Sequence, residues 1–253
     1  MTALLAVALG NTTAAIALAI DDRLTLVRRT PIDRLDGLRD VLVRGCPDCG
    51  GEATAIAVAS VNPAATEQFA ALVDSMTLPR PYAARVDFPI PLATALEEPE
   101  RAGADRLLGA LAAHRLTGGA CITVDCGTAI TVNAVAADGV FVGGAIFPGA
   151  RLMARALARG TAALPEVPLP DAAEAVGNSP ERAIAAGLVH GMAGAVTALI
   201  AGARLKVGAA APVILTGGGA ARLAPHLPAD CRAVRENLVL EGLVIAYRAW
   251  AKP

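Results

Sequence analysis

Residues suited to chemistry gather at one bend in the middle of the chain, between two apolar runs. The runs, Ile122–Val124 and Ile130–Val135, are β-branched and of strand length. Asp125, Gly127 and Thr128 lie at the bend. A glycine there lets backbone N–H groups approach an anion, a threonine hydroxyl adds a donor, and a carboxylate suits a cation. The pattern indicates either a phosphate-binding turn or an ordinary hairpin whose polar side chains satisfy only turn hydrogen bonds.

A similar pattern opens the chain, 117 residues earlier. Leu5–Gly10 aligns with Ile122–Gly127, and each glycine is followed closely by a threonine, Thr12 or Thr128. The match predicts a duplicated α/β protein with halves at residues 1–117 and 118–253, and a nucleotide in the cleft between them. The two copies differ at one position of interest, where the second copy has Asp125 and the first has Ala8.

Alternating strands and helices are expected to position these turns. Apolar runs predict strands at residues 4–9, 14–20, 24–28, 55–60, 122–124, 130–135 and 213–215. Helical spacing and start signals predict helices at residues 33–44, 64–76, 104–116, 150–158, 179–205, 220–223 and 237–250. Residues 79–102 are rich in proline and are expected to form an irregular surface loop.

The composition limits the classes of function. Hydrophobic residues make up 55% of the chain and the mean hydropathy is +0.53, which excludes a disordered protein. The formal net charge is −1 with no long basic run, so no nucleic-acid partner is expected. Five cysteines without a secretion signal indicate a reducing, cytoplasmic setting. The lone Cys46–Cys49 pair favours a surface turn over a metal site, which would need four ligands.

One apolar segment needs a separate explanation. Gly187–Ala203 carries no Asp, Glu, Lys or Arg and is at the lower edge of the length that spans a membrane. Its glycine and alanine content favours a helix buried in the core or in a subunit interface, so no membrane partner is expected. The segment also predicts a homodimer, because so apolar a helix is more easily buried against a partner than exposed to water.

Several short motifs occur together in a fixed order. They are Leu9-Gly10-Asn11-Thr12, Ser60-Val61-Asn62-Pro63, Gly103-Ala104-Asp105-Arg106, Val124–Ala129, Gly143–Gly149, Thr161–Pro165, Thr216–Ala220 and Leu240–Leu243. In these motifs and their spacing, nearly from end to end, the chain resembles type III pantothenate kinases. That family lies in the acetate and sugar kinase/heat-shock protein/actin superfamily, so the resemblance implies duplicated ribonuclease-H-like (actin-like ATPase) halves.

The resemblance implies ATP-dependent phosphorylation of pantothenate to 4'-phosphopantothenate, the first step of coenzyme A synthesis, with Mg²⁺ and a monovalent cation, K⁺ or NH₄⁺. By this resemblance Asp105 is the general base, and Asp125 binds the monovalent cation. Family members are usually homodimers. The implied substrate contacts are Leu96, Gly103, Ala104, Arg106 and Ser179. The implied nucleotide contacts are Ala8, Gly10, Asn11, Thr12 and Thr128.

The chemistry of Asp105 agrees with that role. A carboxylate near the acceptor hydroxyl orients it and takes its proton, and phosphoryl transfer otherwise needs mainly positioning and charge neutralisation. The start of a helix favours an ionised acid. The alternative is that Asp105 and Arg106 are merely a charged pair on the surface at a helix N-terminus.

Three positions depart from the family pattern. Ala8 replaces the Asp of the first phosphate motif, which helps to hold magnesium in this superfamily. Leu96, three residues before Pro99, stands where an aromatic side chain is common, and Asn133 stands where an acid is common. These changes leave three readings open: a pantothenate kinase impaired by Ala8, a non-catalytic homologue that binds a ligand and regulates, or a kinase for another small alcohol.

Overall fold

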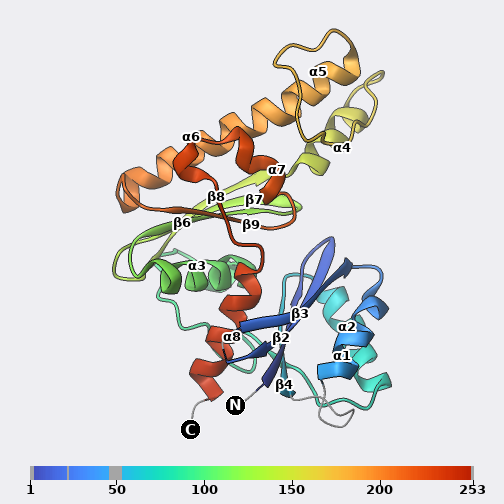
Figure 1. Cartoon of the computed structure of the whole chain (residues 1–253), viewed down its shortest axis with the longest axis vertical. Helices are drawn as coiled ribbons and strands as arrows, with labels where there is room; N and C mark the ends of the chain where they lie inside the picture. Colours follow the sequence, from blue (N-terminus) through green and yellow to red (C-terminus); the bar gives the residue numbers. More distant parts are fainter. Residues whose placement is uncertain (1–2, 22, 46–52, 252–253) are drawn as a thin grey trace. The chain divides into compact units, whose positions relative to one another are not determined.

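The chain is described by a computed structural model that covers residues 3–21, 23–45 and 53–251. It separates into two compact units (Figure 1). Unit 1 comprises residues 1–93, 97–112 and 238–253, and unit 2 comprises residues 94–96 and 113–237. These units do not follow the single boundary expected at residue 117, because the last helix packs with the N-terminal strands. The halves 1–117 and 118–253 therefore remain a proposal about the sequence repeat.

The two sheets have the same topology. Sheet 1 has the order β3 (Arg23–Pro31), β2 (Thr13–Ile20), β1 (Ala3–Leu9), β4 (Ala53–Ser60) and β5 (Tyr82–Ala83). Sheet 2 has the order β8 (Phe141–Pro148), β7 (Ala129–Val135), β6 (Cys121–Cys126), β9 (Val213–Thr216) and β10 (Ala233–Val234). In both, the first three strands pair antiparallel and the last two pair parallel. The predicted duplicated α/β fold is confirmed.

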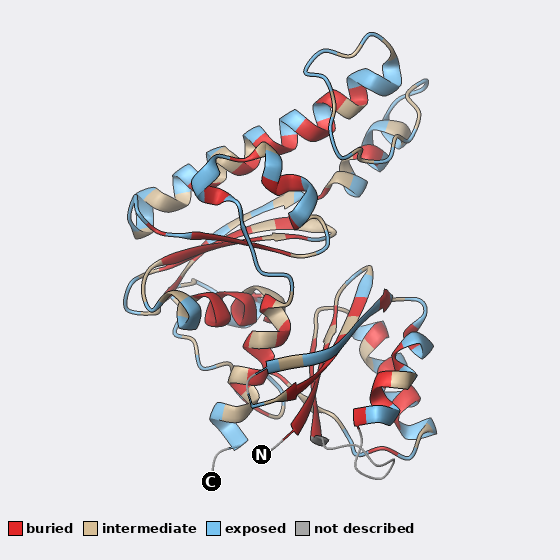
Figure 2. Ribbon diagram, in the orientation of Figure 1, coloured by how far each residue is buried: buried red, intermediate tan, exposed pale blue. Residues whose placement is uncertain are grey.

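Side chains on alternate faces of β1 build two cores in unit 1, as the period of two along a strand requires. Leu5, Val7 and Leu9 pack with a 3-10 turn, η1 (Leu35–Leu38), and with helices α1 (Arg39–Gly45) and α2 (Pro63–Ser75). Leu4 and Ala6 face α3 (Ala104–Thr117) and α8 (Leu238–Ala251) instead. Both β1 and β6 are buried along most of their lengths (Figure 2).

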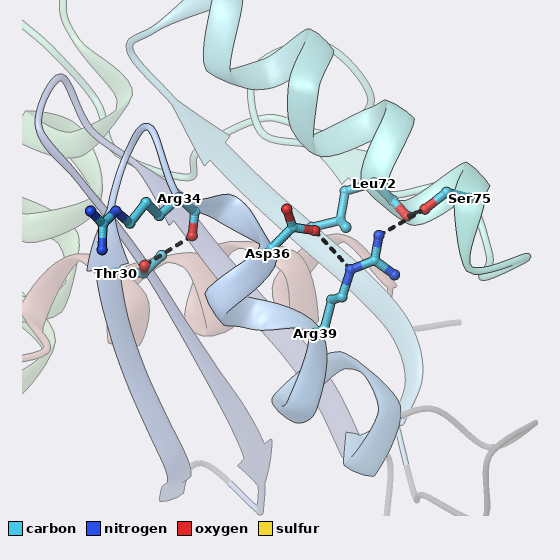
Figure 3. Close-up of polar contacts among 6 residues, drawn as sticks. All are labelled: Thr30, Arg34, Asp36, Arg39, Leu72 and Ser75. Atoms are coloured by element: carbon cyan, nitrogen blue, oxygen red, sulfur yellow. Dashed lines mark hydrogen bonds and ion pairs between the residues drawn. The ribbon is translucent and has the colours of Figure 1, made fainter.

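Polar contacts tie the outer layer of unit 1 together (Figure 3). Thr30 at the end of β3 donates to the Arg34 carbonyl at 2.9 Å. Arg39 donates to the Asp36 carboxylate at 2.8 Å and to the Ser75 hydroxyl at 3.4 Å, which joins α1 to the end of α2. The expected helix at residues 33–44 is thus a 3-10 turn followed by a short α-helix.

In unit 2, one long helix covers a face of sheet 2. The expected helix at residues 179–205 consists of α5 (Pro180–Ala186), a π-helical turn, η4 (Gly187–Gly191), and α6 (Met192–Val207). Met192, Val196 and Ile200 are buried against β6 and β7, together with α7 (Ala220–Leu223). Helix α4 (Ala150–Gly160) follows β8 and buries little more than Ala154.

The same helix is the one segment that meets the length and hydropathy of a membrane span in the part of the chain that the structure describes. Pro180–Val207 contains an 18-residue window with a mean hydropathy of 1.8, of which 44% is buried within the fold. Because core helices of globular proteins pass the same test, this is weak support for a membrane span.

The expectation for residues 79–102 is only partly right. The segment is largely irregular, with β5 and a 3-10 turn, η3 (Pro99–Arg101), as its regular parts. It is not a surface loop, however, because Ala84, Phe88 and Ala102 are buried. Cys46–Cys49 lies outside the described residues, so the surface turn expected there stays a prediction.

Candidate functional site

Each sheet contains one glycine turn, which joins β1 to β2 in sheet 1 and β6 to β7 in sheet 2. In the β1–β2 turn, the Gly10 N–H donates to the Thr13 carbonyl at 3.0 Å, and in the β6–β7 turn the Gly127 N–H donates to the Ala129 carbonyl at 3.0 Å. Strand pairing resumes at Leu9–Ala14 and at Cys126–Ile130. The second turn is therefore one residue shorter, which explains why Thr12 and Thr128 fall one place out of register in the repeat.

Glycines from distant parts of the chain surround the Asp125 turn. Asp125 is half-buried and lies between Thr131 of β7 and Thr216 of β9 in the strand register. Gly217 has a φ of 83°, and a β-carbon there would lie 2.2 Å from Asp125 Oδ1. Only glycine fits this position, because other residues would be strained and would strike the carboxylate.

A second close approach fixes the same turn from β8. The Gly149 N–H donates to the Thr128 carbonyl at 3.1 Å, and a β-carbon on Gly149 would lie 2.5 Å from the Gly127 and Thr128 carbonyl oxygens. The Gly219 N–H donates to the Cys126 carbonyl at 2.9 Å. Two further chain segments, at Gly149 and at residues 217–219, thus hold the backbone beside Asp125.

Cys126 lies in this turn but is not a nucleophile. It is 6% exposed, and burial, with a smaller effect of the Asp125 charge, raises the pKa of its thiol to about 12. The thiol is therefore neutral at physiological pH, and neutral thiols react slowly with electrophiles. Its side chain packs with the apolar residues beneath the turn.

The position in unit 1 that corresponds to Asp125 is apolar. Ala8 is half-buried against the apolar cluster on the α8 side of sheet 1, and its neighbours in the register are Ala15 and Ala59. A methyl group cannot coordinate a metal, so Ala8 does not fit the magnesium carboxylate of the first phosphate motif. Asp125 does fit a cation. The described residues contain no group of three or more His, Cys, Asp or Glu that could hold a metal.

Asp105 lies in the first turn of α3. Its Oδ1 accepts a hydrogen bond of 2.8 Å from the Arg106 N–H, one of the donors left unpaired at a helix start. Gly103 leaves the space that this carboxylate occupies, because a β-carbon there would lie 2.5 Å from Asp105 Oδ1 and 3.6 Å from Val61. Burial lowers the pKa of Arg106, and the Asp105 charge opposes that shift. Arg106 stays charged, since arginine does not deprotonate in proteins.

Other expected site residues have structural contacts of their own. Leu96 belongs to unit 2, where the preceding Ala95 N–H donates to the Phe141 carbonyl at 2.9 Å. Ser179 caps α5 by accepting from the Arg182 N–H at 3.3 Å, as its position before Pro180 indicates. Unit 1 contains Ala8, Gly10–Thr12 and Gly103–Arg106, and unit 2 contains Leu96, Asp125, Thr128 and Ser179.

The third departure, Asn133, is 1% exposed within sheet 2. Its amide donates to the Thr123 and Thr131 hydroxyls, each at 3.2 Å. An uncharged amide suits so buried a position because its donors find partners there, whereas an ionised acid would be costly to bury.

The sequence motifs do not identify one residue that contacts the chain just before Asp105. Arg85 donates to the carbonyls of Pro99, Glu100 and Ala102, immediately before Gly103. No motif marks it, because its partners are backbone oxygens 14 to 17 residues along the chain.

Comparison with known proteins decides the family. A family model described as type III pantothenate kinase matches residues 4–202. The chain belongs to the type III pantothenate kinase family. Membership agrees with a fold in which two glycine turns occupy corresponding places in two sheets of the same topology. It also implies ATP and a divalent metal as requirements of the family reaction, which is phosphorylation of pantothenate.

Relatives from several bacteria carry the same family name. The type III pantothenate kinase of Roseiflexus sp. is 34% identical over 251 residues, covering 96% of this chain and 98% of that protein. That of Thermomicrobium roseum is 37% identical, covering 78% and 76%. That of Halorhodospira halophila is 49% identical over 150 residues, so the match spans 58% of each chain.

Solved structures at low identity show the fold alone. A Baf family protein from Campylobacter jejuni superposes with a TM-score of 0.61 at 17% identity, covering 98% of both chains. An activator of 2-hydroxyisocaproyl-CoA dehydratase from Clostridium difficile, solved with bound ADPNP, gives a TM-score of 0.57 at 10% identity, covering 98% and 95%. Both support the actin-like fold of this pantothenate kinase family member.

Proposed function

We propose that this chain transfers the γ-phosphoryl group of ATP to the terminal hydroxyl of pantothenate, at a rate lowered by Ala8. The products are ADP and 4'-phosphopantothenate. The observation that carries the second part is the methyl group at Ala8, packed against an apolar cluster where the family has a carboxylate. The intact Asp105 and Asp125 turns support the first part.

Asp105 is the proposed general base. The acceptor oxygen forms a bond to the γ-phosphorus while the bond from that phosphorus to the bridging oxygen of ADP breaks, and the hydroxyl proton passes to the Asp105 carboxylate. Because Oδ1 already accepts from the Arg106 N–H, Oδ2 takes the proton. Gly103, Ala104 and Arg106, with Leu96 and Ser179 as further contacts, are proposed to hold pantothenate.

The glycine turns are the proposed phosphate contacts. Gly10, Asn11 and Thr12 in unit 1 and Thr128 in unit 2 would present N–H and hydroxyl donors to the nucleotide. Asp125 would hold a monovalent cation, K⁺ or NH₄⁺. A bound divalent metal would neutralise phosphate charge, and this chain offers one carboxylate fewer for it than the family pattern does.

The test is an ATP-dependent assay with pantothenate, Mg²⁺ and K⁺, followed by mass spectrometry of the product, with other small alcohols assayed in parallel. We expect slow formation of 4'-phosphopantothenate, and Asp105→Asn should lower kcat with little change in ligand affinity. Product from a different alcohol would favour the changed-substrate reading. Ligand binding without turnover, even after Ala8→Asp, would favour a non-catalytic regulator.

We propose that the protein is a cytoplasmic homodimer. The motivation is the exposed side of the long helix, where Gly187, Gly191 and Gly194 leave open space around their α-carbons and Leu205 is 89% exposed. So apolar a face is better buried against a second copy than hydrated. Light scattering at micromolar concentration is expected to give about twice the chain mass of 25.4 kDa, and a clean monomer would contradict the dimer.

A further inference from the structure

The turn that leads into Gly103–Arg106 is held by one side chain from elsewhere in unit 1. The Arg85 guanidinium donates to the Glu100 carbonyl at 2.8 Å, to the Pro99 carbonyl at 3.1 Å and to the Ala102 carbonyl. These oxygens belong to the 3-10 turn η3 and to the residue that ends it. They are the carbonyl end of a helical turn, where a cation is favoured.

The segment that carries Arg85 is itself tightly built. Arg85 has a φ of 70°, in the left-handed region that a non-glycine residue adopts at a cost in conformational energy. Its N–H donates to the Phe88 carbonyl at 2.7 Å. The Asp87 carboxylate accepts from the Ala83 N–H at 2.7 Å and from Arg80 at 2.7 Å. These bonds hold the backbone of Arg85 in its left-handed conformation.

Aromatic packing anchors the same segment. Phe88 is 2% exposed and lies within ring-contact distance of Tyr247 and Trp250 on α8, at centroid separations of 5.5 and 5.7 Å. Tyr82, at the start of the segment, contacts the same two rings at 5.7 and 5.5 Å. Four of the chain's seven Phe, Tyr and Trp residues thus support one short segment.

We propose that Arg85 is a positioning residue for the kinase reaction, acting through the 99–102 turn to fix the Asp105 carboxylate at the start of α3. The inference rests on the proposed role of Asp105. The link is covalent and short, since Ala102 is separated from Asp105 only by Gly103 and Ala104. A glycine at 103 leaves this connection flexible, so bonds to the preceding carbonyls limit where the carboxylate can lie.

Arginine is specifically suited to this role. Its planar guanidinium presents several donors in a fixed arrangement, and three carbonyl oxygens can share them. A lysine ammonium would keep the charge but could not reproduce the planar fork. Arg101, on η3 itself, provides a matched control because its side chain is exposed and forms an ion pair with Glu98 at 2.5 Å.

The test is a double-mutant cycle of Arg85→Gly and Asp105→Asn, with Arg85→Lys and Arg101→Ala as companions. Glycine accepts the left-handed backbone, so Arg85→Gly removes the side chain without straining the fold. If the parent turns over too slowly, the cycle is made on the Ala8→Asp protein. Hydrogen exchange of the amides in residues 99–107 and thermal unfolding are measured on the same proteins.

Arg85→Gly and Arg85→Lys should each lower kcat by about tenfold to a hundredfold, because small misplacements of a reacting group have effects of this order. KM for ATP should stay close to the parent value, and the unfolding midpoint should fall by only about a few degrees, because hydrogen bonds of the 99–102 turn are lost. In the Asp105→Asn background the further loss should be about twofold or less, since residues that act through one another are not additive. Arg101→Ala should leave kcat unchanged.

Equal losses in both backgrounds would overturn the proposal, because Arg85 would then act independently of Asp105. If kcat fell across the variants in proportion to their thermal stability, Arg85 would have only a structural role, and this result would also overturn the proposal. If no protein of the series phosphorylates pantothenate, the proposed function fails. The positioning role of Arg85 is then tested by hydrogen exchange alone. Faster exchange confined to residues 99–107 in Arg85→Gly would support the positioning role, and unchanged exchange would refute it.

Discussion

The β1–β2 and β6–β7 turns occupy the same place in two sheets of identical topology, yet they differ in length, in polarity and in their surroundings. The second turn contains Asp125 and is held by Gly217 and Gly149. The first contains Ala8, and its neighbour at the end of β4 is Ser60 rather than a glycine. Sheet topology depends on strand pairing and buried apolar side chains, and both are retained in each half.

The difference shows that chemistry at a turn can change while the fold beneath it does not. Ala8 is half-buried among alanines, so the first strand loses nothing in packing when the carboxylate is absent. Asp125 is packed more closely, because a β-carbon on Gly217 would lie 2.2 Å from its Oδ1. A carboxylate at this position is therefore not needed for packing in unit 1, whereas in unit 2 it is in close contact with the surrounding turn.

The largest expected effect comes from restoring the symmetry of the two turns. Ala8→Asp should raise kcat for pantothenate by about a hundredfold to a thousandfold, the usual value of one preorganised charged or donor group in a transition state. The Mg²⁺ concentration needed for half-maximal rate should fall. Steady-state kinetics with a Mg²⁺ titration measures both.

A matched control tests whether position or charge matters. Ala15→Asp places a carboxylate on the neighbouring strand, directly opposite Ala8 in the register. It should not raise kcat. A similar gain from both substitutions would mean that the added negative charge raises the rate wherever it lies near the turn, and not because a carboxylate at Ala8 binds the metal.

The reverse change makes the second turn resemble the first. Asp125→Ala should lower kcat by about a hundredfold and abolish any dependence of the rate on K⁺. Circular dichroism should show an intact fold. Activity that still responds to K⁺ in this variant would remove Asp125 from the cation site.

A smaller effect, on stability rather than rate, separates the two surroundings. Gly217→Ala should lower the free energy of unfolding by about 2–3 kcal/mol, because of its positive φ and the contact with Asp125. Ser60→Ala, at the corresponding position, should lower it by about 0.5–1.5 kcal/mol, since Ser60 loses only its bonds to Asn62. Urea unfolding of the two variants compares them, and equal losses would contradict the tight fit of the second turn.

The smallest effect concerns Cys126. Its pKa is raised from 9.0 to about 12 in the folded chain, so the unfolded chain ionises first as pH rises. The stability due to its neutral thiol is complete below about pH 9 and is lost towards pH 12. Iodoacetamide should label it slowly at pH 9 in the folded protein and rapidly in urea. Asp125→Ala removes the smaller cause of the shift and should speed labelling slightly.

Much of the fold could be predicted because its signals are local. The alternating runs of β1, β2, β6 and β7 and the Ser179-Pro180 helix start each carry their own signal. The short strands β5 and β10 have two residues each, too few for a periodic pattern. The π-helical turn at Gly187–Gly191 leaves no trace in residue types.

The site was predictable only where function depends on side-chain identity. Asp105, Asp125 and the glycine turns stand in motifs, so the sequence marks them. Arg85 binds main-chain oxygens, which are chemically alike in every residue, so nothing at residues 99–102 indicates its partner. The contact between Gly217 and Asp125 joins residues far apart in the chain, and no local pattern predicts it.

Helix α8 has a consequence for how the protein is made. It covers the face of sheet 1 that carries Ala8, with Leu240 and Leu243 packed against Leu4 and Ala6. These strands leave the ribosome before this helix does, and residues 113–237 of unit 2 are translated in between. The part of this apolar face that α3 does not cover therefore stays exposed while unit 2 is translated. A nascent chain stalled at residue 237 should bind a hydrophobic dye or a chaperone, and one stalled beyond α8 should release it.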